Sequence, residues 1–187
     1  HCSLGTKPDF GALRTNEYLS PGFILPYASS FGCFWKRCSF CPERSEDNPY
    51  SHNSPATTVR DLQSLVTDTS PSLVHLLDNA VSPATLRALS ESTGIGPWYG
   101  FVRFEAPLDD LNFCRRLRLS GCVMLKLGLE SGDQGVLDRL DKGIRLPLVS
   151  KVLRNLKEAG ISTYVYLLFG TPAETRKEAE HTLSFVE

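Results

Sequence analysis

The sequence has little that would direct a protein to a membrane or to a nucleic acid. Lys and Arg total 20 against 21 Asp and Glu, so the formal net charge is only −1. A charge this balanced provides no broad basic surface for phosphate groups. No apolar run approaches the roughly 18 residues of a transmembrane helix, and no basic start followed by an apolar stretch indicates a signal peptide. We therefore expect neither a membrane partner nor a nucleic-acid partner for this segment.

Cysteine is scarce outside one short segment. The chain has six cysteines in 187 residues, and three of them fall between Cys33 and Cys41. A secreted disulfide framework would spread its cysteines through a small, loop-rich chain. A tight cluster without an export signal fits a metal site in a reducing compartment better, so we expect a cytoplasmic protein.

Strand and helix signals alternate through most of the chain. We expect strands over residues 23–28, 73–77, 99–104, 123–129 and 163–169. Ser-Pro pairs at 54–55 and 82–83 open two of the intervening helices, and Thr171-Pro172 opens the last one. Five strands alternating with helices predict an α/β fold with a parallel sheet and right-handed crossovers. Residues 1–22 are irregular and are predicted to be a lead-in or linker, with a single domain over 23–187.

The clustered cysteines have the residue type and number of an iron–sulfur site. Thiolates are soft ligands that suit iron–sulfur clusters or zinc. Three cysteines on one loop hold three irons of a cubane, and the fourth iron is then open to an outside ligand. Structural zinc sites use four protein ligands, often as two close pairs, and a second close pair is missing from this sequence. The alternatives are three structural cysteines, or zinc completed by His52 or by a distant cysteine. Cys114 and Cys122 are predicted to be small core residues.

Strand alternation sorts the polar side chains onto one face of the predicted sheet. That face of the third, fourth and fifth strands carries Phe101, Arg103, Glu105, Met124, Lys126, Gly128, Glu130, Tyr164 and Tyr166. If helices cover the apolar face, these side chains line the inside of a barrel, where buried charges must be paired or must bind a polar ligand. Structural ion pairs, Lys126 with Glu130 or Arg103 with Glu105, are the alternative.

The cysteine loop and four later motifs resemble the radical S-adenosylmethionine superfamily. The usual spacing in that family is C-x3-C-x2-C with an aromatic residue before the last cysteine, and Phe40 matches that aromatic. The chain departs by one residue, because four residues separate Cys33 from Cys38. Further matching segments follow in the order and spacing of the family at 98–105, 128–132, 142–144 and 168–172. They are most similar to the branch with methylthiotransferases, oxygen-independent coproporphyrinogen oxidase and cobalamin-binding members.

This resemblance implies a partial (β/α) barrel of the TIM-like type with its site at the carboxyl ends of the strands. The usual core has six strands and only five are readable, so we expect the domain to be incomplete at its C-terminal end. By position match, Cys33, Cys38 and Cys41 hold a [4Fe–4S] cluster. The same match assigns Phe40 to the adenine of S-adenosylmethionine and Asp78-Asn79 to its amino group. The residues placed around the ribose and methionine moieties are Glu105, Glu130, Lys142 and Tyr166.

The resemblance also implies an activity. The reduced cluster cleaves S-adenosylmethionine to a 5′-deoxyadenosyl radical, which abstracts hydrogen from a substrate that the sequence does not identify. An electron donor such as a flavodoxin or ferredoxin is implied as partner. The lead-in motifs at 8–10, 18–21 and 25–26 are similar to the segment that joins a cobalamin domain to a radical core, so cobalamin bound by an upstream domain is a further expectation. The alternative function is a non-catalytic iron–sulfur or zinc module for electron transfer or scaffolding.

Overall fold

A five-stranded parallel sheet organises the molecule. The structure, a computed structural model, describes residues 7–172 and 174–187. The sheet order is β1-β4-β5-β6-β7, and every neighbouring pair runs parallel. The strands are β1 (Ile24–Tyr27), β4 (Leu73–Leu76), β5 (Trp98–Val102), β6 (Cys122–Glu130) and β7 (Ser162–Leu167). β1 and β7 lie at the two edges of this sheet, so it is an open, partial barrel, and all five predicted strands are confirmed.

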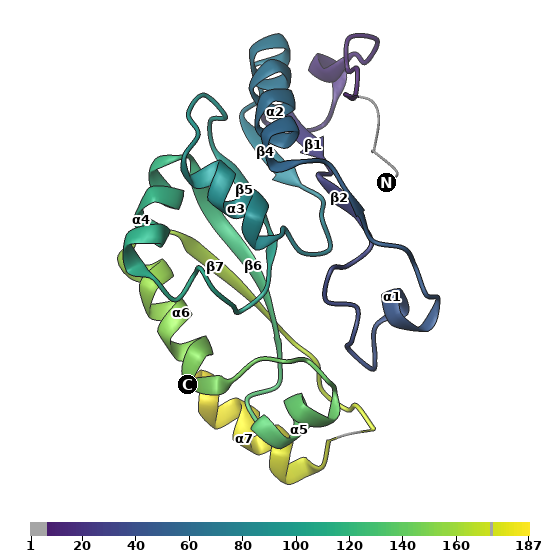
Figure 1. The fold of residues 1–187 in the computed structure, drawn as a ribbon, viewed down its shortest axis with the longest axis vertical. Helices are drawn as coiled ribbons and strands as arrows, with labels where there is room; N and C mark the ends of the chain where they lie inside the picture. Colours follow the sequence, from purple (N-terminus) through teal and green to yellow (C-terminus); the bar gives the residue numbers. More distant parts are fainter. Residues whose placement is uncertain (1–6, 173) are drawn as a thin grey trace.

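Helices lie between successive strands and after the last one, and they pack on the apolar face of the sheet. They are α2 (Pro55–Thr69), α3 (Pro83–Ser90), α4 (Leu111–Leu119), α5 (Gln134–Arg139), α6 (Leu146–Glu158) and α7 (Arg176–Val186). Figure 1 shows α3, α4 and α6 side by side on one face, and contacts join α2 to α3, α3 to α4 and α4 to α6. No helix among the described residues is both long enough and apolar enough to cross a membrane.

The segment that carries the clustered cysteines lies apart from this helical layer. It runs from β2 (Ser30–Phe31) through the short helix α1 (Pro42–Ser45) to β3 (Ser51–His52), which pairs antiparallel with β2. In Figure 1 this segment lies on the other side of the sheet from α3 and α4. A single 3-10 turn, η1 (Thr15–Glu17), precedes β1 in the lead-in.

The sequence positions the helix starts by local hydrogen bonds. Ser54 and Ser82 cap α2 and α3, each side chain accepting a hydrogen bond from the backbone N–H three residues later. The expected start of the last helix at Thr171-Pro172 is wrong, because α7 begins at Arg176. Thr175 forms the capping box with Glu178 there.

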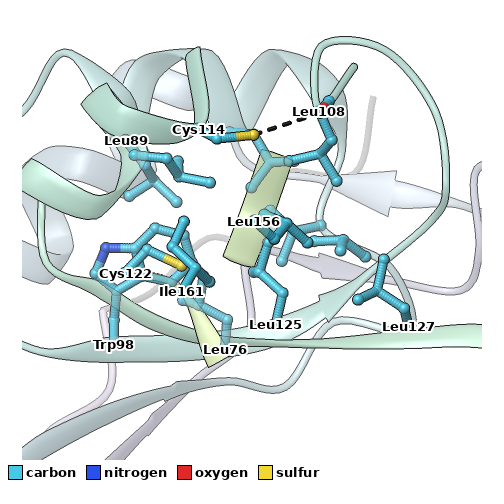
Figure 2. Packing of buried hydrophobic residues seen from close by; sticks show 14 of the residues in the cluster. Leu76, Leu89, Trp98, Leu108, Cys114, Cys122, Leu125, Leu127, Leu156 and Ile161 are labelled. Carbon is cyan, nitrogen blue, oxygen red and sulfur yellow. Dashed lines mark hydrogen bonds between the residues drawn. The ribbon is translucent and has the colours of Figure 1, made fainter. Parts of the chain in front are cut away.

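The hydrophobic core lies between the sheet and its helices. Figure 2 shows Trp98 and Cys122 among leucines from the strands and from α3 and α6. Cys114 and Cys122 are both fully buried in this cluster, which confirms their prediction as core residues. The strict alternation expected in β6 fails at its start, since a register shift between β5 and β6 places Cys122 in the core and leaves Val123 outside the cluster.

Candidate functional site

All three clustered cysteines line one cavity of about 380 Å³ at the carboxyl ends of the strands. Its walls come from the cysteine loop, from residues at or just beyond the ends of β4, β5 and β6, and from the turn after α5. The residues that line it are Cys33, Cys38, Phe40, Cys41, Pro42, Glu43, Asn79, Ala80, Phe101, Arg103, Glu130 and Lys142. The site is therefore where a parallel β/α sheet places its chemistry.

The thiols of this cavity fit the donor set of an iron–sulfur cluster. Cys33, Cys38 and Cys41 are free cysteines that face one common space. Within 7–172 and 174–187, no three His, Cys, Asp or Glu side chains are grouped to hold a metal ion. The ligands of a single zinc ion all lie within about 2.3 Å of one point, whereas the thiolates of a cubane bind different irons and lie apart. Three free thiols that line one cavity match the donor type and number of a [4Fe–4S] cluster with one open iron.

Three contacts fasten the cysteine loop to the turn after α5. Trp35 donates from Nε1 to the carbonyl oxygen of Asp141 at 3.1 Å, and the backbone N–H of Ser39 donates to the carbonyl oxygen of Leu140 at 2.9 Å. Arg37 forms a fork with the Asp141 carboxylate, at 3.2 Å from Nε and 2.9 Å from Nη2. These contacts join segments about a hundred positions apart in sequence, and they hold the loop over the end of the sheet.

Trp35 also packs directly on Gly143 and beneath Arg103. A Cβ atom on Gly143 would lie 2.0 Å from Trp35 Cζ2, and Gly143 has φ +70°, so the backbone and the ring both require glycine. The Arg103 guanidinium lies 4.3 Å from the Trp35 ring centroid. Its Nη2 donates to the Lys142 carbonyl oxygen at 2.5 Å, while its Nε is buried without a hydrogen-bond partner.

Glu130 and Lys142 form a buried ion pair in the wall of the cavity. Lys142 Nζ lies 2.9 Å from Glu130 Oε1, with the two side chains 7% and 12% exposed. Glu130 has φ +67°, a left-handed conformation that is costly for a residue with a side chain. The expected alternative pair of Lys126 with Glu130 is wrong, because Lys126 Nζ instead lies 4.9 Å from the ring centroid of Tyr99.

Cations surround the most buried of the three thiols. Burial raises the pKa of the Cys38 thiol, and the charges of Lys142 and Arg103 oppose that rise. Lys142 Nζ also lies 6.0 Å from the centroid of the Phe40 ring, which is half-exposed at the mouth of the cavity. The cavity thus favours an anionic occupant near Cys38.

The side chain of Asp78 contacts the start of β2, whereas the side chain of Asn79 faces the cysteine cavity. Asp78 is buried, and its carboxylate accepts hydrogen bonds from the Ser29 N–H at 3.1 Å, the Ser29 hydroxyl at 2.6 Å and the Ser30 hydroxyl at 2.5 Å. These bonds commit it to the start of β2. Asn79 faces the cysteine cavity, where its amide donates to Glu43 Oε1 at 2.8 Å. Of this predicted pair, only Asn79 lines the space beside the cysteines.

Tyr166 and Glu105 lie outside the cavity that holds the cysteines. Tyr166 lines an adjoining cavity of about 280 Å³ with His75 and Lys126, and this cavity shares Asn79 and Phe101 with the first. Glu105 lines neither, and no ion pair with Arg103 forms among the described residues. Burial raises the pKa of the Glu105 carboxyl, with the Arg103 charge opposing the rise.

Sequence reasoning missed two members of the site and underrated a third. Trp35 gave no motif signal, since it falls in the spacer between the first two cysteines. Glu43 lies two residues after Cys41, and its Oε2 is buried without a partner. Arg103 was assigned to the correct face, but its stacking on Trp35 depends on a contact between residues 68 positions apart, which no local pattern reports.

Comparisons with known proteins agree with this geometry. The Radical SAM superfamily matches residues 27–186. The cobalamin-dependent S-adenosylmethionine radical enzyme OxsB, with aqua-cobalamin bound, has a TM-score of 0.69 at 18% identity over 87% of this chain and 26% of its own. TsrM, a radical S-adenosylmethionine methyltransferase from Kitasatospora setae, has a TM-score of 0.71 at 21% identity over 87% and 33%.

A third similar structure is coproporphyrinogen III oxidase, HemN, from Escherichia coli, with a TM-score of 0.61 at 16% identity over 88% of this chain and 41% of its own. The chain thus spans well under half the length of each of these three structures. At such identities the likeness establishes the shared fold, and these structures come from the branches that the sequence motifs indicated. A comparison with curated proteins finds no match.

Proposed function

This chain belongs to the Radical SAM superfamily and is the core of a radical SAM enzyme, and from that membership we propose that Cys33, Cys38 and Cys41 bind a [4Fe–4S] cluster. When bound, the cluster supplies the electron that cleaves S-adenosylmethionine to methionine and a 5′-deoxyadenosyl radical, which abstracts hydrogen from the substrate. The observation that carries the proposal is the single cavity that holds all three thiols beside charged and aromatic side chains.

The cavity offers groups that complement the adenine and the charged groups of S-adenosylmethionine. Phe40 presents an exposed ring face for the adenine, and Asn79 an amide for the methionine amino group. The Lys142 ammonium and the Glu130 carboxylate are already paired at 2.9 Å. The carboxylate and amino group of a zwitterionic ligand would therefore bind to an ammonium and a carboxylate that are both already present in the cavity wall. We assign these four residues to binding and orientation of the cofactor.

Three further residues enter the proposal on different grounds. Tyr166 lies in the adjoining cavity, and we keep it beside the ribose and methionine moieties on position match. Asp78 orients the loop through Ser29 and Ser30, and we propose that it acts on the cofactor only through Asn79, its neighbour in the chain. Glu105 remains assigned to the ribose and methionine region on position match alone.

The test is anaerobic reconstitution of the purified protein followed by iron, sulfide and product analysis. We expect about four irons and four sulfides per chain, and release of 5′-deoxyadenosine and methionine on addition of dithionite and S-adenosylmethionine. Cys38→Ala should lose both the cluster and the products. Cys114→Ala, which removes a thiol from the core, should keep the cluster. Stoichiometric zinc without iron uptake would refute the proposal.

Binding and cleavage of S-adenosylmethionine distinguish the enzyme from the alternative of an electron-transfer module. A protein that assembles its cluster but neither binds nor cleaves S-adenosylmethionine, even with candidate substrates present, would transfer electrons only. We propose that a flavodoxin or ferredoxin supplies the electron in the cell. Cobalamin bound by a domain outside these 187 residues is also proposed, supported by the lead-in motifs. Corrinoid analysis of the longer protein would test it.

A further inference from the structure

Arg103 is a buried cation without a carboxylate partner. The residue is 5% exposed, and its Nη2 reaches only the backbone carbonyl oxygen of Lys142. Among the ion pairs of the described residues, none involves Arg103, and its Nε has no hydrogen-bond partner. The nearby Glu130 carboxylate is already paired with Lys142. Since a buried charge is costly unless it is compensated, the arrangement calls for a negative charge from an occupant of the cavity.

The environment of Arg103 indicates where that negative charge lies. Arg103 lines the same cavity as the three cysteines. The carboxyl of Glu105 also senses the Arg103 charge, but it lies outside this cavity. Besides the Glu130 carboxylate, which is paired with Lys142, and the Glu43 carboxylate, which accepts a hydrogen bond from Asn79, the anionic groups that line the cavity are the thiolates and the sulfur atoms they would carry.

Trp35 holds the guanidinium in this position. The Arg103 guanidinium lies 4.3 Å from the indole centroid, and the Arg37 guanidinium lies 5.0 Å from the same ring. Trp35 itself is fixed by Gly143 and by its hydrogen bond to the Asp141 carbonyl oxygen. Stacking of this kind restrains a planar guanidinium more than it would restrain a lysine ammonium.

We propose that Arg103, stacked on Trp35 from the spacer between Cys33 and Cys38, raises the reduction potential of the cluster by holding a fixed positive charge in the cavity that the three thiols line. The inference rests on the proposed function. The step it affects is the addition of one electron from dithionite or a flavodoxin-type donor, which takes the cluster from the 2+ to the 1+ state. Because the added electron increases the negative charge, a nearby cation stabilises the reduced form. Arg103 is a positioning residue and touches no reacting atom of the substrate.

The experiment compares the midpoint potential of the reconstituted cluster among single variants by EPR-monitored redox titration. Arg103→Gln removes the charge, Arg103→Lys keeps a charge but loses the planar group, and Arg115→Gln removes a charge from the exposed side of α4 as a matched control. Iron content and circular dichroism are measured on every sample, so that loss of the cluster is distinguished from a change in its potential.

We expect the potential to fall clearly in Arg103→Gln, to fall less in Arg103→Lys, and to stay unchanged in Arg115→Gln. A full iron load with an unchanged potential in Arg103→Gln overturns this inference and leaves the proposed function intact. Absence of iron from the unsubstituted protein overturns the proposed function instead. If Arg103→Gln cannot retain its irons, the neutral Arg103→Met decides instead: a lowered potential supports the inference, and an unchanged one shows that Arg103 only holds the loop.

Discussion

Gly143→Ala tests whether the cysteine loop depends on the packing of Trp35. The new Cβ would lie 2.0 Å from Trp35 Cζ2, a distance that no side chain tolerates, so the indole must move. Movement breaks the 3.1 Å hydrogen bond to the Asp141 carbonyl oxygen and the stacking under Arg103. The substitution also forces alanine into a left-handed conformation at φ +70°.

The cost is the sum of three effects. A non-glycine residue in the left-handed region loses about 1–2 kcal/mol. The hydrogen bond contributes about 1 kcal/mol, and a partly buried cation–π contact contributes about 1–2 kcal/mol. We therefore expect Gly143→Ala to lower the free energy of unfolding by about 3–5 kcal/mol.

Gly96→Ala is the matched control, because Gly96 has φ +71° but a Cβ added there would meet no heavy atom within 4 Å. It carries the backbone strain alone and should cost about 1–2 kcal/mol. Urea denaturation of both variants measures the difference, with the slope m checked for constancy. Tryptophan emission gives a second readout, since the chain has two tryptophans and Trp98 is fully buried, so a red shift in the native state reports movement of Trp35. Equal losses in the two variants, with no spectral shift, would show that Trp35 does not hold the loop.

Three further predictions concern other parts of the molecule. Glu130→Gln leaves the buried Lys142 charge unpaired and should cost about 3–5 kcal/mol in urea denaturation; combining it with Lys142→Met should recover part of that loss, and simple additivity would argue against the pair. Ser54→Ala removes the cap of α2 and should cost about 1 kcal/mol in thermal unfolding without altering iron content; loss of iron would contradict a purely local role. Burial raises the pKa of the Cys114 thiol from its ordinary value of 9.0 to about 11. The buried neutral thiol should therefore contribute stability in full below pH 9, and this contribution should be lost as the pH rises toward 11. At pH 8, mass spectrometry should show that iodoacetamide modifies Cys114 far more slowly in the native protein than in the urea-unfolded protein.

The sequence alone determined the architecture, because the signals for it are local. Apolar runs of strand length separated by capped helices define the five strands to within two residues at each end, and the Ser-Pro pairs at 54–55 and 82–83 mark two helix starts. Each of these signals depends on residues within one or two turns of chain. The three clustered cysteines are equally local, and their number and residue type were sufficient to suggest the cluster.

The last helix shows where local patterns are ambiguous. Thr171 with Glu174 and Thr175 with Glu178 both have the spacing of a capping box, and only the second opens the helix. In the structure Glu174 instead accepts a hydrogen bond from the Gly170 N–H at 2.6 Å. The two-residue capping pattern does not decide which of these two threonines begins the helix, because the helix start depends on the path of the chain after β7.

Only the tertiary structure decided which charges meet in the site. Strand alternation placed Arg103, Lys126 and Glu130 on one face. It did not show that Glu130 pairs with Lys142 rather than with Lys126, or that Arg103 has no carboxylate partner among the described residues. Those outcomes depend on the turn after α5 folding back over the sheet, where Gly143 accepts the Trp35 ring. Ion pairs and ring stacking form between side chains that the fold brings within a few ångströms of each other. The number of residues between two side chains in the sequence does not predict that distance.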